Sequence, residues 1–359
     1  MTEQAERLPG RRQRLAHACK RAGLLSTLTG LRGLVRRDLR ILAYHRVLDE
    51  AQLDGFDFDP DLVSATAADF RWQMGLVARH MAPVTFADVI AHIEGGARLP
   101  ARALLVTFDD GYDDNYHVAF PILRELGVPA TFFVSTGHVD SSMPYEYDWL
   151  VHMLLHAPEG EARVEAGPEG EALAFHVPAR REARLALARE LLVRIKEMPA
   201  LAQSALLGRL AALWGMPPRP HRHCRPMTWD QLREMDAAGM EIGSHGVHHR
   251  MLAKLPREEM AWELRTSAER LAAELGHPAV SLAYPVGGPD AYDDAVIEAA
   301  RANGFKAGCS YVSGTSPAAH GERFTLKRIP VERHIDRDWF EAMLALPELF
   351  MHPTPLSRD

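Results

Sequence analysis

A chain of 359 residues is long enough for one large α/β barrel or for two smaller domains. Its 47% hydrophobic and 25% charged residues are ordinary for a folded protein, which excludes disordered and fibrous classes. The formal net charge of −7 gives no general attraction to nucleic acid, and three widely separated cysteines indicate no disulfide framework.

Residues 1–39 form a basic segment that we expect to be a helix. Nine Arg and Lys residues lie between positions 11 and 40 against one acid, Asp38, with Leu and Ala between them at roughly helical spacing. No apolar run approaches the ~20 residues of a membrane span, and we expect no signal peptide. Two interpretations stay open: a solvated helix packed on the rest of the protein, or peripheral contact of residues 11–40 with an anionic membrane. The second would hold a cytoplasmic protein at the inner membrane surface.

From residue 40 onwards, apolar runs of strand length alternate with helical patterns. This alternation predicts an α/β fold of βα units around a parallel sheet. We expect seven strands, at residues 40–44, 103–108, 130–134, 240–244, 280–284, 305–309 and 326–329. The helices expected between them lie at residues 67–80, 116–126, 229–238, 258–275 and 291–303.

One long stretch interrupts this alternation. It contains an apolar helix at 147–155, a Gly- and Pro-punctuated segment at 162–177 with the pattern of a hairpin, and an Arg-, Leu- and Ala-rich helical region ending at Trp214. We interpret it as a mainly helical insertion or lid. The expected divisions of the chain are therefore a basic helical segment at 1–39, barrel segments at 40–139 and 226–335, the insertion at 140–225, and a C-terminal helix and tail at 336–359.

Four of the predicted strands run into residues that carry chemistry or turn the chain. In α/β barrels the reacting groups come from the carboxyl ends of strands. The residues that follow these four strands are His45, then Asp109 and Asp110, then His245 and His249, then the turn Pro285–Gly287. An Asp-Asp-Gly sequence alone is typical of a turn. Behind a buried strand, however, two adjacent carboxylates repel each other, which favours a nearby cation or a shared proton.

His245 and His249 are four residues apart, a spacing that suits two ligands to one metal. His248 is a competitor, and such pairs also arise by chance in a chain with 18 histidines. One carboxylate and two imidazoles suit Zn²⁺, with Co²⁺ and Ni²⁺ as alternatives, and leave positions open for water and substrate. His45 is either a hydrogen-bonded structural residue or an acid or base near neutral pH.

Together these residues resemble a known family. Thr107–Tyr112 (Thr-Phe-Asp-Asp-Gly-Tyr), His245–His249 (His-Gly-Val-His-His) and Ala283–Gly287 (Ala-Tyr-Pro-Val-Gly) resemble the first three motifs of the polysaccharide deacetylase family, the NodB-homology domain of carbohydrate esterase family 4. The flanking segments Tyr44–Val47 and Pro121–Val134 also resemble sequences of this family. The resemblance covers roughly residues 40–139 and 226–335, and it implies a distorted (β/α)₇ barrel.

The resemblance also implies roles for individual residues. Asp109 would be the general base, and Asp110, His245 and His249 would bind the metal. In members that begin with Tyr-His-x-Val the early histidine serves as general acid, which here would be His45. Tyr112, Tyr284, Pro285 and Gly287 would contact substrate.

This sequence departs from the family pattern at three positions. Gly246 stands where Ser or Thr is usual, Ala283 where an Arg is frequent, and Val286 where a Tyr is frequent. The backbone N–H of Val286 would still help to hold an oxyanion. Because the usual Arg orients the base, we expect Arg328, on the last predicted strand, to replace it beside Asp109.

The implied reaction is metal-dependent removal of an acetyl group from the nitrogen of an N-acetylated sugar, in a glycan or a lipid-linked sugar. An O-deacetylase, an amidase acting on a small non-sugar substrate, and an inactive glycan-binding protein of the same fold remain as alternatives. The aromatic residues of the insertion either pack inside it or stack on sugar rings: Tyr145, Tyr147, Trp149 and Trp214.

Overall fold

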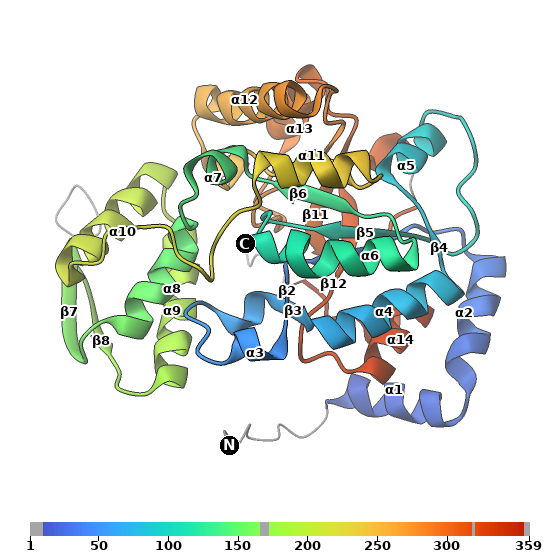
Figure 1. Cartoon of the computed structure of the whole chain (residues 1–359), viewed down its shortest axis with the longest axis horizontal. Coiled ribbons are helices and arrows are strands. Elements are labelled where there is room, and N and C mark those ends of the chain that lie inside the picture. Colours follow the sequence, from blue (N-terminus) through green and yellow to red (C-terminus); the bar gives the residue numbers. More distant parts are fainter. Residues whose placement is uncertain (1–9, 166–171, 318–319, 355–359) are drawn as a thin grey trace.

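A closed barrel of parallel strands forms the centre of the protein (Figure 1). The computed structural model describes residues 10–165, 172–317 and 320–354. The ring closes because the first strand pairs with both the second and the last, so that Leu42 lies opposite Val106 and Ile329. In their order around the barrel the strands are β1 (Arg40–Tyr44), β12 (Leu326–Pro330), β11 (Ala307–Ser313), β10 (Ser281–Ala283), β9 (Glu241–Ser244), β6 (Thr131–Val134) and β5 (Ala103–Phe108).

The seven strands predicted from the sequence are confirmed, and so is the barrel. Their apolar runs are nearly continuous because both faces of each strand are buried. Ile41, Leu105 and Phe133 belong to one buried cluster, whereas the alternating residues Leu42 and Val106 pack in another, with residues of the outer helices. All seven strands point the same way, so their carboxyl ends meet at one end of the barrel.

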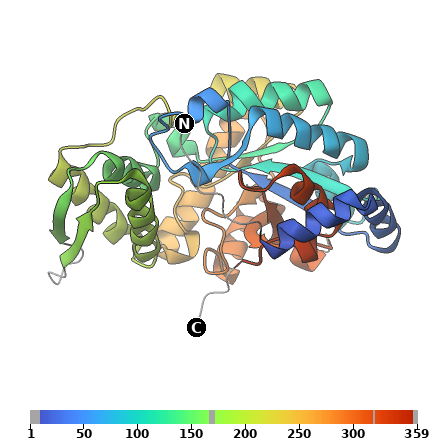
Figure 2. The same cartoon turned by 90° about the horizontal axis from the view of Figure 1, so that it is seen from below.

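Helices cover the outside of the barrel (Figures 1 and 2). The helices predicted from periodicity are all present, although the second begins as a π-helical stretch, η2 (Asn115–Ala119). The main outer helices are α4 (Ala67–His80), α6 (Phe120–Leu126), α11 (Trp229–Ala237), α12 (Arg257–Leu275), α13 (Asp294–Ala302) and α14 (Arg337–Ala345).

Several further elements, most of them short, were not predicted from the sequence. They are β2 (Arg46–Leu48), α3 (Glu50–Leu53), η1 (Pro60–Leu62), β3 (Val63–Thr66), β4 (Ala82–Pro83), α5 (Phe86–Ile93), α7 (Thr136–Ser141), η3 (Leu252–Lys254), η4 (His320–Glu322) and α15 (Pro347–Phe350). Strands β2 and β3 pair with each other beside the barrel, and β4 adds to β5.

The basic N-terminal segment forms two helices rather than the single helix expected. These are α1 (Arg11–Arg21) and α2 (Leu24–Val35), separated at Gly23, whose φ of 68° ends the first helix in the left-handed conformation. Both contact α14. Acids of α14 and α15 pair with part of the basic charge: Glu341 of α14 pairs with Lys20, and Glu348 of α15 with Arg32 at 2.7 Å. In the described part of the chain, no helix combines the length and apolarity needed to cross a bilayer.

The insertion lies at one end of the molecule (Figure 2). It consists of α8 (Glu146–His156), the antiparallel pair β7 (Gly160–Glu165) and β8 (Ala172–Val177), α9 (Arg181–Lys196) and α10 (Ala200–Trp214). The tip of the predicted hairpin, 166–171, lies outside the described residues. Leu150 of α8 and Leu191 of α9 share one buried cluster with Phe58, from the segment between β2 and β3. The insertion is therefore packed on the barrel.

Candidate functional site

A cavity of about 410 Å³ lies at the carboxyl ends of the barrel strands. This volume falls within the range of small-molecule sites. The α9 helix of the insertion forms one wall, through Arg189, Leu192, Val193 and Lys196. The barrel contributes His45, Asp109, Asp110, Tyr112, His245, His249, Val286 and Tyr311.

Asp110, His245 and His249 converge in this cavity. Oδ1 of Asp110 lies 3.5 Å from Nε2 of His245 and 3.2 Å from Nε2 of His249. The three candidate ligand atoms all lie within 4.8 Å of one another. The carbonyl of Ala283 lies 2.8 Å from Nδ1 of His245, which turns the other ring nitrogen towards Asp110.

These residues fit a divalent metal. Oδ1 of Asp110 is buried and has no hydrogen-bond partner among the described residues, although it faces two imidazoles. Burial raises the pKa of this carboxyl, but its contacts with the two histidines outweigh burial and hold the pKa well below its ordinary value. Asp110 is therefore ionised at neutral pH, as a metal ligand must be.

His248, the competitor in the sequence, points elsewhere. Its Nδ1 lies 2.8 Å from Oε1 of Glu263 on α12, and its ring stacks on Trp262. The other oxygen of Glu263 accepts hydrogen bonds from the backbone N–H groups of Val247 and His248. Glu263 thus fixes the loop that carries His245 and His249.

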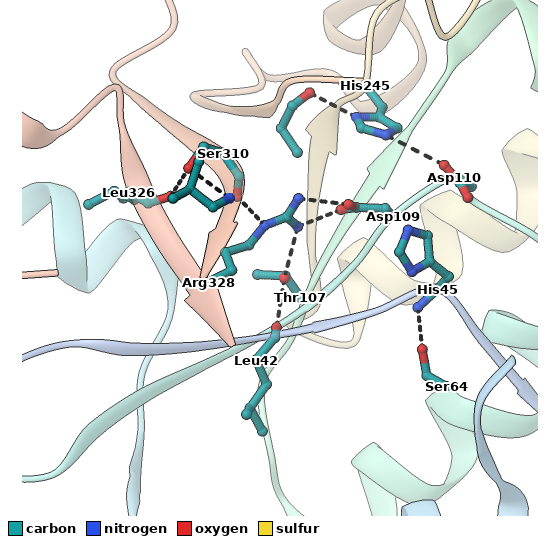
Figure 3. Close-up of polar contacts among 12 residues, drawn as sticks. Leu42, His45, Ser64, Thr107, Asp109, Asp110, His245, Ser310, Leu326 and Arg328 are labelled. Atoms are coloured by element: carbon teal, nitrogen blue, oxygen red, sulfur yellow. Dashed lines mark hydrogen bonds and ion pairs between the residues drawn. The ribbon is translucent and has the colours of Figure 1, made fainter. Parts of the chain in front are cut away.

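Asp109 faces a guanidinium (Figure 3). Arg328 donates to both carboxylate oxygens of Asp109 at 2.7 Å, and to the carbonyl of Ser310, also at 2.7 Å. Arg328 is fully buried. Burial raises the pKa of Asp109, but the charges of Arg328 and His245 lower it by more. The pKa therefore lies below its ordinary value, and the carboxylate is ionised at neutral pH.

The backbone groups of His45 make hydrogen bonds to neighbouring side chains, and the residue lines the cavity. Its N–H donates to Oγ of Ser64 at 2.9 Å, and its carbonyl accepts from Nδ2 of Asn115 at 2.8 Å. The ring lies 5.4 Å from the ring of Tyr311, centroid to centroid.

Three cavity residues have strained backbones. Asp110, His249 and Val286 have φ values of 75°, 57° and 65°, in the left-handed region that non-glycine residues rarely adopt. Each costs roughly 1–3 kcal/mol, and such strain concentrates at functional sites. For a β-branched residue such as Val286 the conformation is a marked outlier.

The four residues predicted to contact substrate are not all at the cavity. Tyr112 lines it, although its hydroxyl donates to Asp148 at 2.6 Å. Tyr284 is fully buried, and its hydroxyl donates to the carbonyl of Phe324, so it does not reach the cavity. Pro285 and Gly287 are buried beside Val286, and neither lines the cavity. The motif turn thus supplies one residue, Val286, to the cavity wall.

Sequence reasoning missed several residues of the site. Tyr311 lies in the wall on β11, Lys196 comes from the last turn of α9, and Glu263 comes from α12. None of these three belongs to a motif identified above. Of the aromatic residues in the insertion, Tyr145 and Tyr147 line the cavity, whereas Trp149 is 2% exposed.

Residues 96–308, more than half of the chain, match the family model described as polysaccharide deacetylase. The chain belongs to the polysaccharide deacetylase family. The match includes Asp109, Asp110, His245 and His249; His45 and Arg328 lie outside it.

Curated relatives of this deacetylase-family chain include two staphylococcal proteins named poly-beta-1,6-N-acetyl-D-glucosamine N-deacetylase. The protein from Staphylococcus epidermidis is 32% identical over 108 residues, which are 28% of this chain and 37% of that protein. One from Staphylococcus aureus is 27% identical over 115 residues, 30% of this chain and 40% of that protein. The matched part therefore spans less than half the length of these relatives.

Solved structures of deacetylases share the fold of this family member. The Streptococcus pyogenes deacetylase PplD in complex with acetate has a TM-score of 0.55 at 17% identity, over 88% of this chain and 99% of that one. IcaB from Ammonifex degensii has a TM-score of 0.53 at 19% identity, over 86% and 97%. At these identities the likeness establishes the barrel fold alone.

Proposed function

We propose that this protein is a metal-dependent N-deacetylase that removes acetyl groups from N-acetylated sugar units of a glycan or a lipid-linked sugar. The observation that carries this proposal is the convergence of Asp110, His245 and His249 beside the Asp109–Arg328 pair, in one cavity of a polysaccharide deacetylase barrel. The names of the staphylococcal relatives support an N-acetylglucosamine polymer as the substrate class.

Amide hydrolysis needs a stronger electrophile, a proton acceptor for water and a proton donor for the leaving nitrogen. Asp110, His245 and His249 would hold the metal, with Zn²⁺ as the best fit and Co²⁺ or Ni²⁺ as alternatives. When bound, such a metal polarises a carbonyl and makes water more acidic.

The residues of the chain would supply the proton transfers. Asp109 takes the proton of the attacking water at a carboxylate oxygen, while Arg328 holds that carboxylate in place. The N–H of Val286 donates to the oxygen that becomes negative in the tetrahedral intermediate. His45, in its protonated form, gives a proton to the sugar nitrogen as the C–N bond breaks. The products are acetate and a free amino sugar.

The test combines metal analysis with acetate release. We expect the metal-loaded protein to release acetate from N-acetylglucosamine oligomers, and to act more slowly on O-acetylated glycans of the same length. His249→Ala is expected to lose both the metal of this cavity and turnover, because one of three protein ligands is gone. A metal-loaded protein that released no acetate from any N-acetylated glycan would overturn the proposal.

The wall formed by α9 gives a prediction about substrate binding. Lys196 lines the cavity, with Nζ 5.3 Å from the centre of the Tyr147 ring. A hydrogen bond from a charged donor to a sugar oxygen is worth ~1.5–3 kcal/mol. Lys196→Met is therefore expected to lower kcat/KM by about 10- to 100-fold, mainly through KM. Arg194→Met, at an exposed position of the same helix, is the control and should leave kcat/KM unchanged.

We further propose peripheral contact with the inner, cytoplasmic membrane surface through α1 and α2. Leu24, Leu31 and Val35 are 48%, 55% and 84% exposed, with the basic residues Arg21 and Arg37 exposed near them. Apolar side chains beside unpaired positive charge are typical of helices that lie on anionic lipid.

Vesicle co-sedimentation of the full chain tests this contact. Leu31→Ser with Val35→Ser is expected to weaken binding to anionic vesicles roughly tenfold or more, because two apolar side chains lose their burial in lipid. Binding should also fall with added salt. Leu201→Ser with Leu213→Ser is the matched control, since both residues are exposed on α10 of the insertion. Equal loss of binding in both pairs would argue against the proposal.

A further inference from the structure

A second cluster of candidate metal ligands lies outside the cavity described above. It joins Asp57, in the segment between α3 and η1, to His221 and His223, in the segment that returns from the insertion to the barrel. Oδ2 of Asp57 lies 3.5 Å from Nε2 of His221 and 3.4 Å from Nδ1 of His223. All three candidate ligand atoms lie within 4.8 Å of one another.

The α8 helix adds two more imidazoles to this cluster. His152 and His156 are four residues apart, and their ring centres are 4.6 Å apart. His156 places Nε2 3.2 Å from Oδ1, the other carboxylate oxygen of Asp57. The ring of His152 lies 5.1 Å from that of His221. Asp57 and three of these histidines, 152, 156 and 221, line one cavity of about 450 Å³.

Two ring nitrogens in the cluster are buried and have no hydrogen-bond partner among the described residues. Nδ1 of His223 and Nδ1 of His152 make no hydrogen bond to any described residue. Both Nδ1 atoms are shielded from solvent, and His152 as a whole is 8% exposed. A buried polar atom without a partner costs ~1–3 kcal/mol, and an unseen ion is one of the explanations that such an atom calls for.

The donor set of the cluster also favours a metal ion. Arg46, whose guanidinium donates to the carbonyl of His223, is already neutralised by Asp114, at 2.7 Å. The described ion-pair partners of Asp57 are three imidazoles, those of His156, His221 and His223, although Arg219 lines the same cavity. One carboxylate with several imidazoles is the donor set that Zn²⁺ and neighbouring divalent metals prefer.

We propose that Asp57, His221 and His223 bind a divalent metal ion, with Zn²⁺ as the best fit, at a second site separate from the deacetylase cavity. His156 orients the Asp57 carboxylate from its other oxygen, as outer partners of metal ligands commonly do. His152 or water completes the coordination. The ion ties the return segment to the segment between α3 and η1, and through His156 it reaches α8.

This second site is linked to the wall of the first cavity. Asp59 and Asp61 follow Asp57 closely in the chain, and both pair with Arg189 of α9, at 3.0 and 2.7 Å. All three of these residues line the deacetylase cavity. A metal on Asp57 therefore fixes the segment against which the α9 wall rests, and its role is structural.

Metal counting on the tag-free full chain tests the proposal. After removal of metal with a chelator and reloading with Zn²⁺ alone, elemental analysis is expected to find two equivalents per chain. His249→Ala should retain one equivalent, and His221→Ala with His223→Ala should also retain one. His277→Ala is the matched control, because His277 pairs with Asp236 at 3.0 Å outside the cluster, and it should retain both.

A second measurement does not depend on activity. In the His249→Ala background, Zn²⁺ is expected to raise Tm by several degrees, and the rise should vanish when Asp57→Asn is added, a change that keeps the shape of the side chain. Two results would overturn the second site. The first is a wild-type chain that binds one equivalent of Zn²⁺ and loses it entirely in His249→Ala. The second is a chain that still binds two equivalents when His221 and His223 are both replaced by Ala. Neither result would bear on the proposed deacetylase activity.

Discussion

Asp109→Asn is expected to lower turnover by about 10²- to 10⁴-fold while the protein stays folded and keeps its metal. The asparagine amide has nearly the shape of the carboxylate, but it cannot take a proton from water. One oxygen remains to accept from Arg328, so the buried guanidinium keeps part of its hydrogen bonding. Acetate release under saturating metal, with metal content measured on the same sample, checks this expectation.

A second buried Asp–Arg pair provides the control. Asp114 accepts from Nε of Arg46 at 2.8 Å, and neither residue lines the deacetylase cavity. Asp114→Asn should cost comparable stability and leave turnover within a few-fold of wild type. Near-normal rates in Asp109→Asn would show that another group takes the proton.

Arg328→Met is expected to destabilise the fold by ~3–5 kcal/mol, because it leaves the carboxylate of Asp109 buried without its counter-charge. Arg328 and Asp109 have side-chain exposures of 0% and 3%, so water cannot replace the guanidinium. Burial would then raise the pKa of Asp109 unopposed by this charge. Because Asp109 acts as a base only when ionised, the acid limb of the activity profile should move to higher pH. Thermal unfolding and a pH–rate profile measure the two effects.

A double variant separates positioning from stability. In Arg328→Met with Asp109→Asn no lone charge remains buried, so part of the lost stability should return. Turnover should not return, since the base is absent. If Arg328→Met alone kept wild-type turnover and the same acid limb, Arg328 would have no part in holding the base.

The barrel could be predicted because its strands are buried on both faces and therefore read as continuous apolar runs. The short strands β2, β3 and β4 could not, since two to four residues show no periodicity. The N-terminal segment was predicted as one helix because a glycine does not by itself mark a break in a helical pattern. Gly23 ends α1, whereas Gly30 and Gly33 lie inside α2.

The candidate site was predictable where a residue follows a strand directly. Asp110 and His245 meet because parallel strands bring their carboxyl ends together, which spacing along the chain can indicate. Contacts made by long side chains across the barrel, such as Glu263 with the histidine loop, depend on helix placement and leave no local pattern. Tyr284 was predicted to contact substrate because it belongs to a motif, but its side chain is buried and its hydroxyl donates to the carbonyl of Phe324.

The left-handed backbone conformations in the cavity have a consequence for engineering this protein. At Asp110 and His249 the proposed chemistry uses the side chain, so the conformational cost there cannot be relieved without losing the metal. At Val286 the proposed chemistry uses only the peptide N–H, which every residue except proline provides. Val286→Gly should therefore raise the heat resistance of the protein without loss of turnover. Selection for heat resistance alone would also favour replacement of Asp110 or His249, and the resulting proteins would be stable but inactive.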